Sequence, residues 1–246
     1  MFKNSNLLTQ RRKFSFKHAT VVTFCCLLCR GAFGQDMAAE NASGCHCFQE
    51  RTFNPVDKFA TDEYILATSF NSLLSRSFTL PKRDIVMLKM QGGVGQNDLL
   101  IALQAAKVSG IELKHLLSFR ERKFTWSKIL SELLPSEKFK NDPVLPGLQS
   151  ALSETEAGQK IADQLLVEFF QVPEKVVLDL RASGLNEKEM TLLLVLDRAG
   201  KLAPQEGARQ HAQEGKSWSE IAHQLGIEPA EAGKLIIDFP ASKLME

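Results

Sequence analysis

The chain has 246 residues, of which 44% are hydrophobic and 24% are charged. It is therefore long and apolar enough to fold around one large or two modest cores, and this composition excludes an intrinsically disordered protein. Its 30 Lys and Arg residues nearly balance its 29 Asp and Glu residues, which is ordinary for a globular protein.

Residues 1–34 differ from the rest of the chain, because they carry six basic residues and no acid. An apolar run from Ala19 to Cys29 follows the basic region, and the small residues Ala32 and Gly34 come next. This order is typical of a secretory signal peptide and predicts cleavage after Gly34. The run is too short for a transmembrane helix, which needs about 20 apolar residues. We therefore expect no transmembrane anchor in the mature protein.

The signal also predicts the destination of the protein. Arg11 and Arg12 resemble the pair in a twin-arginine signal, but Ser15 and Phe16 depart from the usual residues after that pair. We therefore favour the general secretory route and expect a periplasmic or secreted protein. Removal of the signal leaves 24 basic residues against 29 acids, a charge of about −5. An acidic protein repels phosphate backbones, so no nucleic acid partner is expected.

Residues 35–61 are expected to be irregular, and they contain the only cysteines of the mature chain, Cys45 and Cys47, with His46 between them. In an oxidising compartment this pattern has three interpretations: a strained local disulfide, disulfides to a partner, or a redox or metal site. Three clustered ligands are one short of a closed zinc site. The spacing is not that of covalent haem attachment, and no cofactor is predicted.

The sequence matches itself when it is shifted by 92 positions. Six positions between residues 73 and 92 are then identical to their counterparts. Leu73, Leu74, Phe78, Pro81, Leu88 and Gly92 match Leu165, Leu166, Phe170, Pro173, Leu180 and Gly184. The same shift places Trp126, Ile129 and Leu133 on Trp218, Ile221 and Leu225. Self-similarity of this kind predicts two copies of one structural unit.

The predicted organisation after the Cys-x-Cys segment is therefore a first helical repeat over residues 62–134 and a second over residues 155–226. Residues 135–154 form a Pro-rich linker between them, and residues 227–246 form a C-terminal helix or tail.

Start and stop signals divide each copy into helices. Thr61 before two acids suits an N-cap, and Gly110 and Gly200 suit the ends of the third helices. Neither copy alternates like a strand, so we predict an all-α protein. In the last helix of each copy the matched Trp, Ile and Leu residues form one apolar stripe. We expect Trp126 and Trp218 to be equally buried, each against the first helix of its own copy.

Residues 216–226, KSWSEIAHQLG, are similar to the first helix of many helix-turn-helix units. The second helix of such a unit presents Arg, Asn, Gln or Ser to base edges. The next helix, PAEAGKLI over residues 229–236, contains a single base and has Glu228 and Glu231 at its start. We therefore interpret the Trp helix as part of the core, and a DNA-binding regulator is the weaker alternative.

The end of the second copy has the pattern Gly-x-x-Trp-x-x-Ile-Ala-x-x-Leu-Gly over residues 215–226. It resembles the ending of helical repeats in exported or hypothetical bacterial proteins of unknown function. The first copy has Lys123 and Leu134 in place of the two glycines. The resemblance implies a helical-repeat architecture and no particular activity.

Two Glu-x-x-His pairs have the spacing of di-iron bundle ligands: Glu112 with His115, and Glu220 with His223. Both pairs are expected to lie off the apolar faces of their helices, whereas metal ligands must point inward. We therefore interpret them as solvated helix surface. No Ser, His and Asp set stands out, so the sequence indicates no catalytic residue.

Together these features predict an exported binding or scaffolding module whose partner is another protein. One alternative is a thiol-redox or metal-handling protein that acts through Cys45 and Cys47, with His46 as a third ligand. The DNA-binding regulator is a further alternative, which requires the N-terminal segment not to be an export signal.

Overall fold

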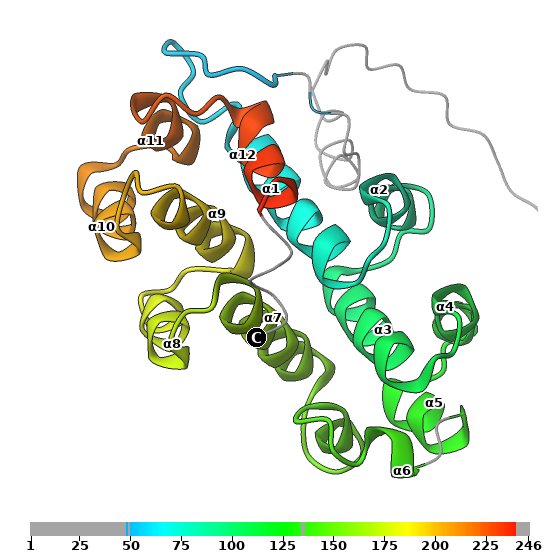
Figure 1. Ribbon diagram of the computed structural model, residues 1–246. Coiled ribbons are helices and arrows are strands. Elements are labelled where there is room, and N and C mark those ends of the chain that lie inside the picture. The colour runs from blue at the N-terminus through cyan, green and yellow to red at the C-terminus, as the bar shows by residue number, and fades with distance from the viewer. Residues whose placement is uncertain (1–47, 49, 134–135, 240–246) are drawn as a thin grey trace, which may run out of the picture. The chain divides into compact units, whose positions relative to one another are not determined.

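The computed structural model describes residues 48, 50–133 and 136–239, and these residues contain helices and no strand (Figure 1). The predicted all-α fold is therefore confirmed for this part of the chain. Among the same residues, the hydropathy and length of every helix fall short of what a membrane-spanning helix needs. The helices are α1 (Asp62–Ser77), α2 (Lys82–Met90), α3 (Gln96–Ser109), α4 (Leu113–Glu121), α5 (Trp126–Leu133), α6 (Ser136–Phe139), the 3-10 helix η2 (Leu145–Gln149), α7 (Glu154–Phe170), α8 (Glu174–Ala182), α9 (Glu187–Arg198), α10 (Pro204–Glu214), α11 (Trp218–Gln224) and α12 (Pro229–Ile237).

Helices α7 to α11 follow one another in the same order as α1 to α5. Each begins 91 or 92 residues after its counterpart. We call residues 62–133 the first half and residues 154–226 the second half. A residue of the first half thus has a structural counterpart 91 or 92 positions later.

The two halves interlock. Helix α1 packs against α9, and its counterpart α7 packs against α3. The first helix of each half therefore lies on the third helix of the other half. Helix α12 runs beside α1, as Figure 1 shows. Buried residues of both halves belong to one continuous hydrophobic core, so the halves do not have separate interiors.

The matched Trp helices contribute to this core. Trp126 is fully buried and Trp218 is 2% exposed. Leu133 and Leu225 are half-buried at the edge of the core, whereas the rest of the predicted core set is buried: Ile129, Ile221, Leu73, Leu74, Leu165 and Leu166. The partner helix differs from the expectation, because α11 packs against α1 of the other half.

Local side-chain bonds fix several helix ends. Asn186 caps α9 in a capping box with Glu189, and Gly110 ends α3 in the left-handed region at φ 76°. Ser217 accepts a hydrogen bond from the backbone N–H of Glu220 at 3.0 Å. Thr61 does not cap α1 with its side chain, because its hydroxyl donates to the Thr52 carbonyl at 2.8 Å.

The segment between the halves takes part in the core. It forms α6 and η2, and it buries Phe139, Val144, Leu145 and Leu148. Asp142 accepts the backbone N–H groups of Val144 and Leu145 at 3.0 and 2.8 Å, which fixes the turn into η2. The prolines predicted the turns of this segment but gave no sign that its apolar residues would be buried.

Candidate functional site

The two Trp helices are held by matched hydrogen bonds between the halves. The backbone N–H of Trp126 donates to Glu154 at 3.2 Å, and that of Trp218 donates to Asp62 at 3.0 Å. Glu154 and Asp62 stand at the first positions of α7 and α1. Each half thus supplies the carboxylate that satisfies a free N–H at the start of the other half's Trp helix.

The indole groups are held in a matched way as well. Trp126 donates its ring N–H to Asp98 at 2.7 Å, and Trp218 donates to Glu189 at 3.2 Å. A polar side chain of the fourth helix covers each ring. Arg120 lies 5.5 Å from the Trp126 ring, and His211 stacks on Trp218 with ring centroids 4.1 Å apart. The carboxylates that accept from the two Trp residues join parts of the fold, and we assign them no catalytic or binding role.

The histidines of the two Glu-x-x-His pairs are at the surface. His223 contacts Glu228 at 2.9 Å and stacks on Phe53, whereas His115 packs edge-on against Phe119. No group of three or more potential metal ligands occurs among the residues that the structure describes. The Cys45, His46 and Cys47 cluster lies outside those residues.

Helices α11 and α12 do form a helix-turn-helix pair. However, α12 packs along α1, and Ala232, Gly233 and Ile236 are buried. The exposed side chains of α12 are Ala230, Glu231, Lys234 and Ile237. This surface has one base and none of the Arg, Asn or Gln side chains that read base edges.

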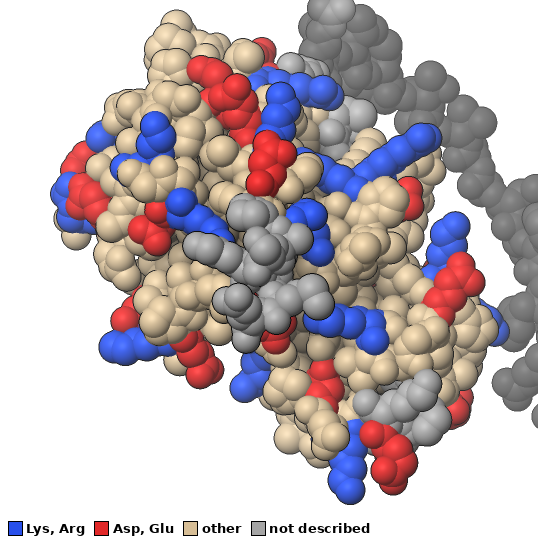
Figure 2. All heavy atoms as spheres, viewed as in Figure 1, with Lys and Arg blue, Asp and Glu red and all other residues tan. Residues whose placement is uncertain are grey.

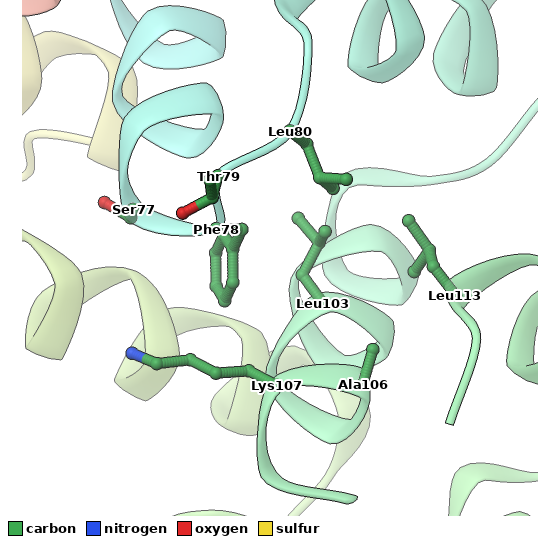
Figure 3. A pocket seen from close by; sticks show the side chains of 8 residues that line it. All are labelled: Ser77, Phe78, Thr79, Leu80, Leu103, Ala106, Lys107 and Leu113. Atoms are coloured by element: carbon green, nitrogen blue, oxygen red, sulfur yellow. The ribbon is translucent and has the colours of Figure 1, made fainter. Parts of the chain in front are cut away.

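A groove between α2 and α4 is the most distinctive surface feature of the first half. Its inner part is a cavity of about 360 Å³. Figure 3 shows Leu80, Leu103 and Leu113 facing one another across it from three segments of the chain. Lys107 extends past the ring of Phe78, with its Nζ atom 5.8 Å from the ring centroid.

A second cavity of about 500 Å³ adjoins the first, because Leu80 and Leu113 line both. Met87 and Leu88 of α2 extend its apolar floor, so the two cavities form one groove. We call it the α2–α4 groove.

The rim of the α2–α4 groove is charged. Asp84, Glu112 and Lys114 surround the outer cavity, and Lys107 lies at the inner one. None of these four side chains takes part in an ion pair within the described part of the chain. Their charges are therefore available to a ligand.

The second half has a counterpart groove between α8 and α10, with a volume of about 260 Å³. Its charges are paired internally. Arg209 bonds to Glu206 and Glu214 at 2.7 Å. These hydrogen bonds, together with one from Gln210, lower the pKa of Glu206 to about 2. The first groove thus differs from the second in its volume, two cavities of about 360 and 500 Å³ against one of about 260 Å³, and in its free rim charges.

One pair of counterparts differs in size between the two grooves. Gly207 of α10 lies so close to α9 that a Cβ atom there would be 2.3 Å from the side chain of Leu193. The counterpart of Gly207 in α4 is Leu116, and that of Leu193 in α3 is Ala102; both are fully buried. The large and the small residue thus exchange places between the halves, which conserves the packed volume.

Comparisons with models of known protein families, with curated proteins and with solved structures find no match to this chain. Inference about function therefore depends on the geometry of the described residues. Sequence reasoning missed the α2–α4 groove, because its lining residues come from separate segments that only the fold brings together.

Proposed function

We propose that this chain is an exported protein-binding module, and that the α2–α4 groove takes an amphipathic helical segment of another protein. The supporting observation is the open, leucine-lined groove of the first half, whose larger cavity is about twice the volume of the cavity in the second half's groove. Concave apolar surfaces with a few polar groups at the rim are the usual form of a binding site.

The floor of the groove fits apolar anchors. Leu80, Leu88 and Leu113 are only half-buried, so they retain apolar surface that a partner would remove from water. Helical segments bind such grooves with apolar side chains spaced i, i+3 or i+4, and i+7. The two adjoining cavities are long enough together for more than one such side chain.

The rim charges predict where a partner helix carries its own charged residues. Lys107 lies at the inner cavity, and Asp84 lies at the outer one. A partner helix is thus expected to carry an acidic residue near Lys107 and a basic residue near Asp84. Such charge pairs favour one orientation of the helix over the other.

The test is selection from a displayed library of amphipathic helical peptides against the full chain. Enriched peptides should share the apolar spacing and the opposite charges at their two ends. Leu113→Glu places a charge on the groove floor and should weaken their binding by roughly tenfold or more. Gln205→Glu is the control, because Gln205 is an exposed residue at the groove of the second half and its substitution should leave binding unchanged.

Two results would contradict this proposal. One is that the wild-type chain enriches no helical peptide. The other is that selected peptides bind Leu113→Glu as tightly as they bind the wild type. Circular dichroism of both variants separates a lost site from a lost fold.

Export is the second part of the proposal, and it depends on the basic and apolar order of residues 1–34. N-terminal sequencing of the protein from its native cells should find Gln35, or a residue near it, as the first residue. A soluble cytoplasmic pool that retains Met1 would contradict export and would revive the DNA-binding alternative.

A further inference from the structure

A second surface, separate from the α2–α4 groove, carries basic groups without acidic partners. Lys82 and Lys89 stand on the face of α2 that packs against α1. Lys82 donates to the Thr68 hydroxyl at 2.6 Å, and Lys89 donates to the Asn71 side-chain carbonyl at 2.7 Å. Both acceptors are neutral. In Figure 2, basic side chains lie over α2, with an acidic side chain beside them.

The counterpart contact in the second half is charge-balanced. Arg181, the counterpart of Lys89, pairs with Asp163 at 2.5 Å and with Glu187 at 3.4 Å. Asp163 is in turn the counterpart of Asn71. The first half thus keeps the basic group and its hydrogen bond but replaces the carboxylate with an amide.

This replacement leaves positive charge in a partly desolvated position. Burial lowers the pKa of both Lys82 and Lys89 to about 8. Lys188 at the start of α9 lowers the pKa of Lys89 further, and Glu187 opposes it. An ammonium group has three N–H donors, and the bonds above use one on each lysine. Each lysine therefore has donors left for a ligand.

Helix α12 covers the contact of α1 with α2 near Lys82. At Gly233 of α12 a Cβ atom would be 2.8 Å from the Ser72 hydroxyl and 3.0 Å from Nζ of Lys82. Lys82 and Lys89 are each only half-buried, so part of both side chains is open to a small group from solvent.

We propose that Lys82 and Lys89 form a binding site for the oxyanion of a ligand, a phosphate or carboxylate group, between α1 and α2. The bound oxyanion supplies the negative charge that Asp163 supplies in the second half. Lysine suits this role because its ammonium is a compact charge whose donors can turn toward an oxygen atom. The site lies apart from the α2–α4 groove, so it does not depend on the proposed binding of a helix.

Calorimetric titration of the full chain with inorganic phosphate and, separately, with acetate tests the site and distinguishes the two oxyanions. We expect saturable binding of at least one of them to the wild type. Lys89→Met removes one charge-assisted bond and should weaken the binding by roughly tenfold. Asn71→Asp should weaken it to a similar extent, because it restores the internal counter-charge found in the second half.

Asn71→Asp makes the test independent of folding, since the aspartate preserves the shape of the side chain and is expected to pair with Lys89. The matched control is Lys175→Met, which removes an exposed lysine of α8 that pairs with Asp179. It should bind both probes like the wild type. The proposal is overturned if neither probe binds the wild type saturably, or if Asn71→Asp binds as well as the wild type.

Discussion

Trp218 donates its backbone N–H to Asp62 at 3.0 Å, although the two residues are 156 positions apart in the chain. Asp62 also accepts the backbone N–H and the hydroxyl of Ser219, each at 2.8 Å. One carboxylate at the start of α1 therefore caps the start of α11. The contact of Trp126 with Glu154 repeats this relationship in the opposite direction.

Asp62→Ala is expected to destabilise the whole chain. It removes three hydrogen bonds to one carboxylate and leaves the N-terminus of α11 without a partner, which should cost about 2–3 kcal/mol. Chemical denaturation followed by circular dichroism measures the loss. Glu63→Ala is the control, because Glu63 is the exposed neighbouring acid in the same helical turn and should change stability little. Equal effects of the two substitutions would show that Asp62 does not join the halves.

His211→Arg is expected to stabilise the second half by copying an arrangement of the first. Arg120 donates to the Phe124 carbonyl at 2.7 Å and pairs with Asp98 and Glu154 at 2.8 and 2.7 Å. His211 makes only the bond to a backbone carbonyl, that of Lys216, at 2.8 Å.

An arginine at position 211 would have Glu189 and Asp62, the counterparts of the partners of Arg120, within its range. We expect a gain of about 1 kcal/mol that decreases as salt is added. The opposite exchange, Arg120→His, should cost stability because it leaves two carboxylates without their cation. Stabilities measured by urea denaturation at low and high salt check both. A destabilised His211→Arg variant would mean that the two Trp sites are not equivalent.

The difference between what the sequence predicted and what it missed has a physical basis. Gly110 and the Trp218 stripe were identified because left-handed glycines and helical periodicity act within one or two turns. The packing of the first helix of each half on the third helix of the other half was not predicted. The match of Leu73 with Leu165 would be the same whether each half folds on itself or on the other half. Only the tertiary contacts decide between these arrangements.

The candidate sites were missed for a related reason. The leucines of the α2–α4 groove, such as Leu80 and Leu113, are ordinary apolar residues in the sequence, and the groove emerges only when the fold brings their segments together. The contrast of Asn71 with Asp163 likewise gains meaning only from the lysine and the arginine that the fold brings to them. The one cluster that the sequence did single out, at Cys45, lies outside the described residues.

Gly207→Leu should disturb the second half, because Gly207 lies against Leu193 with no room for a side chain. A leucine side chain would overlap Leu193 of α9, so α10 must move outward or the core must repack. Overpacking of this kind costs about 1–3 kcal/mol. Ala212→Leu is the control on the same helix, since Ala212 is exposed. A thermal melt in which both variants behave like the wild type would contradict the close packing of α10 on α9 at Gly207.

The last prediction concerns Lys89 and pH. Its folded pKa is about 8, below the ordinary value of 10.5, because burial disfavours the ammonium form. Between these two values the unfolded chain binds more protons than the folded chain, so the stability of the wild type should rise with pH. Below pH 8 the penalty for the buried charge is fully present.

Lys89→Met removes this titration and should flatten the corresponding part of the curve. The difference in unfolding free energy between the variant and the wild type should fall by about 2 kcal/mol between pH 8 and pH 10.5, after allowance for the partial exposure of the ammonium. The lost bond to Asn71 shifts the whole difference but not its slope, so the slope isolates the charge. Lys188 and Glu187 face the same group from α9, and both stay in place.

Urea denaturation of Lys89→Met and of the exposed control Lys175→Met across this range gives the two curves. A flat difference for Lys89→Met would mean that water reaches the ammonium freely, and a falling one for Lys175→Met would mean that the trend is not specific to the buried position.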